Sequence, residues 1–107
     1  EDDMESMVEY GLSVVNNEPE EALRMYHEAM NLYEGNDRKY PLPVEIIDLS
    51  IAIVLNIAKV DIQQAINLLD IIEVEEFRIE TIDNLIEKTD DEKYKIVLEK
   101  MKEEGLE

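Results

Sequence analysis

The sequence has no cysteine, and it has only three glycines and three prolines among 107 residues. Without cysteine there is no disulfide framework, no thiol nucleophile and no thiolate metal site. So little Gly and Pro leaves few residues for the many turns of an all-β fold. The lack of cysteine and of a visible signal or transit segment agrees with an intracellular protein, cytoplasmic or nuclear. Because the chain starts at Glu1 rather than Met, we expect a domain excised from a longer protein.

Basic residues are also scarce. Ten Lys and Arg stand against 28 Asp and Glu, so the formal net charge is −18, and residues 1–37 hold a single basic residue, Arg24. Binding to nucleic-acid phosphates or to an anionic membrane needs clustered Lys and Arg, and we therefore expect no direct nucleic-acid partner and no membrane partner. A basic protein would be attracted. The alternative interpretation is that the acidic surface serves only solubility.

Long hydrophobic runs are missing as well. The longest, Ile51–Leu55, is far shorter than the ~20 residues that span a bilayer. Apolar residues recur instead at helical spacing, and a hydrophobic content of 45% is typical of a globular protein. We predict one all-α domain over residues 1–107, with about six helices in three antiparallel hairpins.

Capping signals delimit the predicted helices. The predicted spans are residues 3–16, 18–34, 44–60, 62–73 and 75–88, followed by a sixth helix with Tyr94, Val97, Leu98 and Met101 on one face. Asn17 and Asp61 are the expected N-caps of the second and fourth helices, and residues 89–92 are the expected capping box of the sixth. Gly35-Asn36 predicts a helix end, residues 35–43 a connector, and Pro43 the start of the next helix. The third helix is apolar on most of its circumference, which predicts the core helix.

Residues 20–33, EEALRMYHEAMNLY, place Ala22, Tyr26 and Ala29 on one helix face. This spacing resembles the second helix of the tetratricopeptide repeat, where small residues let a neighbouring helix approach closely. The preceding helix fits the first helix of that family through Tyr10, Gly11 and Val14. The turn between the two helices is one residue shorter than in the family, and the proline that closes a repeat is missing after Tyr33.

A second, degenerate repeat lies in residues 44–73. Ala65 and Leu69 match the family pattern there, but Ile72 stands where a small residue is expected, and Ala65 follows Ala22 by 43 residues rather than the family's ~34. The third hairpin keeps no signature. The resemblance implies either a tetratricopeptide-like array or a compact helical bundle.

No catalytic constellation stands out. His27 is the only histidine, and Arg24 occupies the position where a Glu-x-x-His metal site needs a carboxylate. A surface histidine is the simpler interpretation. The acidic clusters at residues 73–76 and 90–92 lack the alternating ligands and the glycine of an EF-hand loop. We therefore predict a protein that is not an enzyme, with no cofactor and no metal.

The resemblance implies a non-catalytic interaction or scaffold domain whose first helices form a concave binding surface. The family's basic clamp for acidic peptides does not fit a chain with so few basic residues before Glu73, so a basic or amphipathic protein segment is the expected partner. The candidate binding residues are Tyr10, Tyr33, Tyr40, Asp48 and Asn56. The candidate repeat-packing residues are Gly11, Ala22, Tyr26, Ala29, Ala65 and Leu69. Tyr10 and Tyr26 also fit simple packing between the first two helices.

Two other functions stay open. An acidic inhibitor could mimic nucleic acid, although the charge is spread along the chain, with net −8 in residues 1–40, −3 in 41–72 and −7 in 73–107. A structural subunit could instead seal its apolar faces against the rest of a larger protein or against a sister chain, so self-association is a further expectation.

Overall fold

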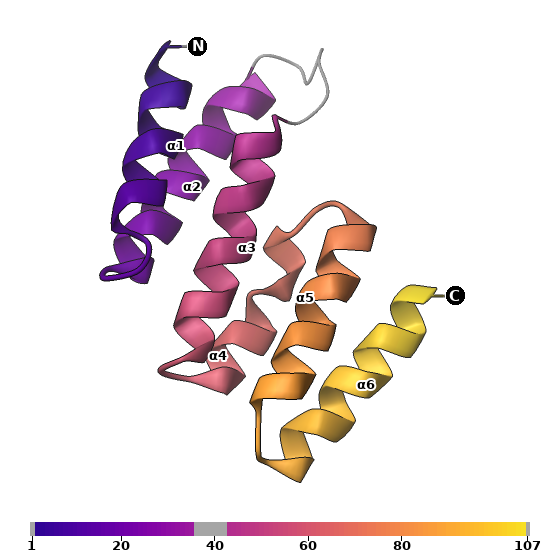
Figure 1. Ribbon diagram of the computed structural model, residues 1–107. Helices are drawn as coiled ribbons and strands as arrows, with labels where there is room; N and C mark the ends of the chain where they lie inside the picture. The colour runs from indigo at the N-terminus through magenta and orange to yellow at the C-terminus, as the bar shows by residue number, and fades with distance from the viewer. Residues whose placement is uncertain (1, 36–42, 107) are drawn as a thin grey trace.

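Six α-helices and one short 3₁₀ turn build the described part of the chain, which is residues 2–35 and 43–106 of a computed structural model. The elements are α1 (Asp2–Val14), α2 (Pro19–Gly35), α3 (Val44–Ala58), α4 (Ile62–Asn67), η1 (Leu69–Ile71), α5 (Glu75–Lys88) and α6 (Glu92–Leu106). These residues contain no strand, so the all-α prediction is confirmed. Consecutive helices run antiparallel and form three helical hairpins in a row (Figure 1).

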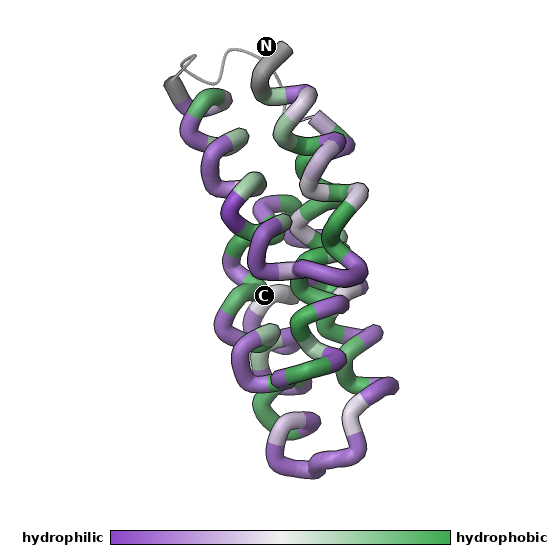
Figure 2. Tube along the Cα trace, turned by 90° about the vertical axis from the view of Figure 1, so that its left-hand side faces the viewer, coloured by the Kyte–Doolittle hydropathy of each residue, from purple (hydrophilic) through white to green (hydrophobic). Residues whose placement is uncertain are grey.

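The row of hairpins is broad and thin. The Cα positions extend over 43 × 33 × 16 Å, and the narrow profile is visible in the rotated view of Figure 2. The helices α1 and α6 lie at opposite sides of the row (Figure 1). Each terminal helix packs against two others, α1 against α2 and α3, and α6 against α5 and α4. Each therefore keeps an outer face toward solvent.

The central helix is α3. It packs against α1, α2, α4 and α5, and Leu49, Ile53 and Val54 are completely buried. A helix that is apolar on nearly all sides is shielded from water only if neighbouring helices cover several of its sides. The four surrounding helices cover α3 in this way. The prediction that this segment is the core helix is confirmed, although the helix ends at Ala58, two residues before the predicted end.

Among the described residues, three polar side chains are buried in the helical interior, and each donates a hydrogen bond to a carbonyl of its own helix. The Ser50 hydroxyl donates to the carbonyl three residues before it at 2.7 Å, and the Asn56 amide donates to the carbonyl four residues before it at 2.8 Å. On α5, the Thr81 hydroxyl donates to the Phe77 carbonyl, four residues before it, at 2.9 Å. Helical carbonyls can accept a second hydrogen bond, so burial of these groups leaves no unmet donor.

Small residues allow the first three helices to meet closely. A Cβ atom at Gly11 would lie 3.0 Å from Cδ2 of Leu49 and 3.5 Å from Cβ of Met25, so a side chain there would displace Leu49. On α2, Ala22 and Ala29 have no exposed surface. Methyl groups and a glycine at these positions let α1, α2 and α3 pack at short range.

The fourth helix is shorter than the predicted span of residues 62–73. Asp61 caps it as predicted, because its Oδ1 accepts from the backbone N–H of Gln64 at 3.2 Å. The helix nevertheless ends at Asn67, where Leu68 turns the backbone (φ −94°, ψ −2°), and one 3₁₀ turn follows before Ile72 becomes extended.

Side chains from two other helices hold this break. The Tyr26 hydroxyl on α2 donates to the Ile71 carbonyl at 2.7 Å, and Nη1 of Arg78 on α5 donates to the Ile72 carbonyl at 2.6 Å. Carbonyls at a helix end have no intrahelical donor, so these bonds satisfy groups that a longer helix would have used itself. The break also leaves Leu69 and Ile72 fully buried.

Two predicted helix starts are wrong. Because α2 begins at Pro19, the residue before it is Glu18 rather than Asn17, and the Glu18 carbonyl accepts from the N–H of Ala22 at 3.1 Å. The predicted capping box at residues 89–92 does not form. Asp91 caps α6 instead, because its Oδ1 accepts from the backbone N–H of Lys93 at 2.9 Å. The backbone N–H of Thr89 is already bonded to the Leu85 carbonyl at the end of α5, so it is not available for a capping box.

The remaining boundaries are close to prediction. The first helix ends at Val14 rather than at residue 16, because the N–H groups of residues 17 and 18 both bond to the Val14 carbonyl. The fifth helix has its predicted bounds, Glu75–Lys88. On α6, Leu98 is buried and Tyr94 and Met101 are partly buried, whereas Val97, at the edge of the predicted apolar face, is 41% exposed. One residue along a helix is a rotation of about 100°, which turns Val97 away from the core.

The predicted connector, residues 35–43, lies mostly outside the described residues, as does Asn36 of the predicted helix end. The helix α2 ends at Gly35. Pro43 precedes α3 as its N-cap residue, with an extended backbone (φ −60°, ψ 143°). Its fixed φ is compatible with a position just before a helix.

Replacing Tyr26 with Phe should lower the free energy of unfolding by about 1 kcal/mol, because the Ile71 carbonyl loses its donor while the ring stays in place. Urea denaturation followed by circular dichroism measures the change. Tyr94→Phe is the matched control, since the Tyr94 hydroxyl makes no hydrogen bond within the described residues. If the free energy of unfolding falls equally in the two variants, the Tyr26 hydroxyl does not stabilise the helix break after Asn67.

Candidate functional site

A hollow of about 370 Å³ lies between α1 and α3, the first helices of two successive hairpins. It is lined by Met4, Glu5, Val8, Glu9, Leu12, Pro43, Glu45 and Ile46. Val8 and Ile46 are buried and form part of an apolar floor, while Leu12 is 36% exposed at its edge. We call this hollow the α1–α3 groove. It combines apolar side chains with carboxylates from both helices.

The periodicity of α1 builds one wall of the α1–α3 groove. Met4, Val8 and Leu12 are spaced by four residues and form a stripe along one helix face. Glu5 and Glu9 follow the first two members of this stripe by one residue, so a row of carboxylates runs beside it. Both glutamates are exposed.

The third carboxylate comes from the opposite wall. Glu45 lies in the first turn of α3 and is exposed. Within the described residues, none of Glu5, Glu9 and Glu45 takes part in an ion pair. The helix α1 has four acidic residues and no basic one, so the groove is negatively charged on both walls.

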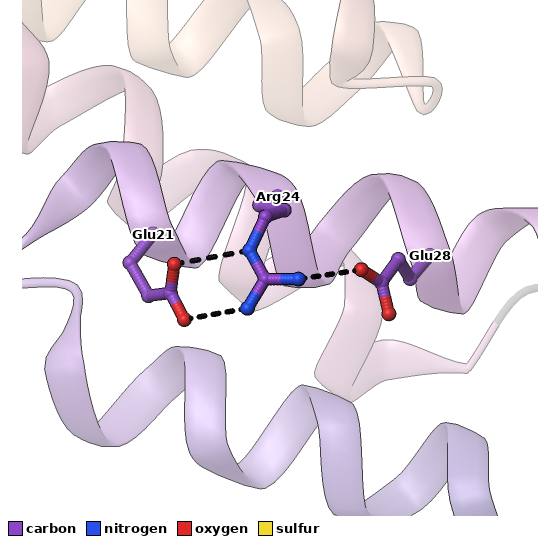
Figure 3. Close-up of polar contacts among 3 residues, drawn as sticks. All are labelled: Glu21, Arg24 and Glu28. Carbon is purple, nitrogen blue, oxygen red and sulfur yellow. Dashed lines mark hydrogen bonds and ion pairs between the residues drawn. The ribbon is translucent and has the colours of Figure 1, made fainter.

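The basic residue nearest to α1 along the chain, Arg24, forms its ion pairs elsewhere (Figure 3). Arg24 on α2 forms ion pairs with Glu21 at 2.8 Å and with Glu28 at 2.7 Å, both on its own helix. The hydrogen bond from Arg24 lowers the pKa of Glu21 below its ordinary value, burial acts in the opposite direction, and the Tyr10 hydroxyl adds a smaller lowering. Arg24 therefore neutralises charge on α2 and leaves the carboxylates of α1 uncompensated.

The predicted binding residues do not meet in the α1–α3 groove. Tyr10 is 45% exposed on α1 and interacts with Glu21 instead, and Asp48 is exposed on α3. Asn56 is buried, with its amide bonded to its own helix and its Oδ1 accepting from Lys59 at 3.3 Å. Tyr33 is partly buried on α2. Tyr40 lies outside the described residues.

The predicted packing residues all lie in the interior. Gly11, Ala22, Tyr26, Ala29, Ala65 and Leu69 are buried. The hydroxyl of Tyr26 reaches from the first hairpin to the end of η1, so this residue joins two hairpins rather than facing a ligand. His27, its neighbour, is exposed and lies edge-on to the Tyr26 ring with the ring centres 5.7 Å apart.

Sequence inspection missed the three carboxylates of the α1–α3 groove. The feature of α1 that could have indicated this site is the apolar stripe that continues to the exposed Leu12, with Glu5 and Glu9 beside it. The position of Glu45 opposite Glu5 and Glu9 depends on how α3 packs against α1, and residue spacing within one helix contains no information on that contact.

Two further hollows lie near hairpin turns. One, of about 380 Å³, lies between the end of α3 and the end of α5, and the lysines Lys59 and Lys88 belong to its lining. The other, of about 560 Å³, lies at the α1–α2 turn and includes Val60 and three glutamates, one of which is Glu21. The first is partly basic, and the second contains a carboxylate already paired with Arg24. Of these three hollows, the α1–α3 groove has the most apolar lining.

The described residues hold no group of three or more His, Asp or Glu side chains arranged to bind a metal ion. None of the helices in residues 2–35 and 43–106 is long and apolar enough to cross a membrane. Comparison of the chain with protein-family models, with curated proteins and with solved structures found no match. The geometry and charge of the α1–α3 groove are therefore the features that bear on function.

Thermal stability should rise when NaCl increases from about 10 mM to about 200 mM. With a net charge of −18, repulsion acts over a Debye length of about 30 Å at the lower concentration and less than 10 Å at the higher. The measurement is the midpoint of thermal unfolding, compared with MgCl₂ at equal ionic strength as the control. A flat or falling dependence on NaCl would mean that bound cations already neutralise the carboxylates.

Proposed function

We propose that this chain is a non-catalytic protein-interaction domain that binds a basic, amphipathic protein segment in the α1–α3 groove. The observation that carries the proposal is the apolar floor between carboxylates on opposite walls, none of them in an ion pair within the described residues. Apolar side chains of the partner would cover Met4, Val8 and Leu12. Lys or Arg side chains on its flanks would meet the glutamates.

The two parts of the groove make different contributions. Burial of apolar surface stabilises a complex by about 25 cal/mol per Å², so the floor supplies most of the affinity. Exposed ion pairs contribute only about 0.2–1 kcal/mol each. They act mainly by speeding association with a basic partner and by disfavouring an acidic one.

The arrangement of the hairpins supports a repeat-like interpretation of this site. In the tetratricopeptide family, which the first hairpin resembles, the first helix of each hairpin contributes to the ligand surface. The helices α1 and α3 hold that place here, and the small residues Gly11, Ala22 and Ala29 lie at close contacts between helices. The short α4 and its 3₁₀ turn depart from that family's pattern.

A direct test uses a fluorescent helical peptide of about 18 residues, built from Ala with Leu on one face and Lys on both sides of the Leu stripe. We expect binding by the wild-type domain. Neutralising the groove with Glu5→Gln, Glu9→Gln and Glu45→Gln should weaken binding at least tenfold, which corresponds to about 1.4 kcal/mol. Fluorescence anisotropy measures the affinity.

The matched control is Glu99→Gln, Glu103→Gln and Glu104→Gln, which removes the same charge from α6. This variant should bind the peptide with an affinity close to that of the wild type. Equal weakening in both variants, or no binding by the wild-type domain, would contradict the groove as the site. Capture of an intact nucleic-acid-binding protein that oligonucleotide displaces, without peptide binding, would favour the acidic mimic instead.

A further inference from the structure

The last helix of this chain has the chemistry that the α1–α3 groove requires. Lys93, Ile96, Val97 and Lys100 on α6 are all exposed, with Ile96 60% and Val97 41% exposed. Their spacing, i, i+3, i+4 and i+7, places them on one face of the helix. We call these four residues the α6 face. It lies on the side away from the buried Leu98 and presents two apolar side chains between two cations.

Charge is divided unequally between the two terminal helices. The helix α1 has four acidic residues and no basic one, whereas α6 has four lysines and four glutamates. Lys102 is bound to Asp83 at 2.6 Å within the same hairpin. Lys93 and Lys100 take part in no ion pair within the described residues, although Lys93 also lies 5.6 Å from the centre of the Tyr94 ring.

We infer that the α6 face of one copy of this chain docks in the α1–α3 groove of a second copy. This inference depends on the binding function proposed for the groove and names its occupant. Ile96 and Val97 would cover the floor formed by Met4, Val8 and Leu12. Lys93 and Lys100 would face the groove carboxylates.

The lengths of the two surfaces agree. Met4 and Leu12 are eight residues apart on α1, which is about 12 Å along the helix. Lys93 and Lys100 are seven residues apart on α6, which is about 10 Å. One face can therefore lie along the other. Because α1 and α6 are at opposite sides of the row (Figure 1), each copy can use its groove and its α6 face at the same time.

Such a contact is heterologous and does not close by two-fold symmetry, so it joins copies head to tail. The net charge of −18 on each copy opposes growth of the assembly. The contact is also small compared with a standard interface. Weak association at high protein concentration and moderate salt is therefore expected.

Sedimentation velocity at about 0.15 M NaCl, over protein concentrations up to about 1 mM, tests the inference. The wild type should show a sedimentation coefficient that rises with concentration. Reversing the α6 face (Lys93→Glu, Lys100→Glu) or the groove (Glu5→Lys, Glu9→Lys) should each abolish this rise. Lys59→Glu with Lys88→Glu, which changes the net charge by the same amount as the α6 reversal but outside both surfaces, should have no such effect beyond a small general repulsion.

Combining the variants makes the test specific. An equimolar mixture of the two reversed variants should associate again and alternate along the assembly, because the two intact surfaces match each other and the two reversed surfaces match as well. A variant with all four reversals should associate at least tenfold more tightly than either double variant, since its charges again match. Circular dichroism checks that each variant is folded, and Ile96→Ser with Val97→Ser gives a second disruption that leaves the charges unchanged.

A wild type that stays monomeric, or a mixture that does not associate, would overturn the inference. The same holds if reversal of the α6 face leaves association unchanged. If the wild type is monomeric but still binds the Leu-Lys peptide, the groove function stands and only its occupant is wrong. If neither the peptide nor a second copy binds, both are wrong.

Discussion

The fold depends on the enclosure of α3. A helix with apolar residues on nearly all sides is stable in water only when other helices cover it, and α3 is covered by α1, α2, α4 and α5. Its residues Leu49, Ile53 and Val54 have no exposed surface. The close contact of Gly11 with Leu49 and the burial of Ala22 and Ala29 serve the same enclosure, because bulkier side chains would hold the first hairpin away from α3.

Enclosure of α3 also determines where the charge lies. Since the neighbouring helices pack their apolar faces against α3, their acidic residues lie on the faces directed toward solvent. On α2 the charge is partly neutralised by Arg24, and on α6 lysines and glutamates are equal in number. On α1 no basic residue is present. The carboxylates of α1 therefore have no basic partner on their own helix, and Glu5 and Glu9 lie beside the apolar edge of the α1–α3 contact. This combination is the basis of the proposed binding function.

Local signals in the sequence were sufficient for features that depend on neighbouring residues. The cap at Asp61 is an example, because a side-chain-to-backbone bond to Gln64 determines it. The bounds of α5 are another, since its apolar spacing and the residues at its two ends lie within the segment itself. The end of α4 could not be predicted in this way. It depends on Tyr26, 45 residues before the carbonyl that it binds, and on Arg78 from the following helix. The cap at Asp91 required knowing that Thr89 is already bound to the end of α5. The groove required the packing of α1 against α3, which places Glu45 opposite Glu5 and Glu9.

The most direct measurement compares Ile53→Asp with Val60→Asp by urea denaturation. Both substitutions add the same charge near the same helix, but Ile53 is completely buried and Val60 is 86% exposed. A buried unpaired carboxylate should cost several kcal/mol, a large part of the ~5–15 kcal/mol that stabilises a domain, so Ile53→Asp should lose cooperative unfolding or most of its stability. Val60→Asp should change stability by less than about 1 kcal/mol. An Ile53→Asp variant that unfolds at the same urea concentration as the wild type would contradict the central role of α3.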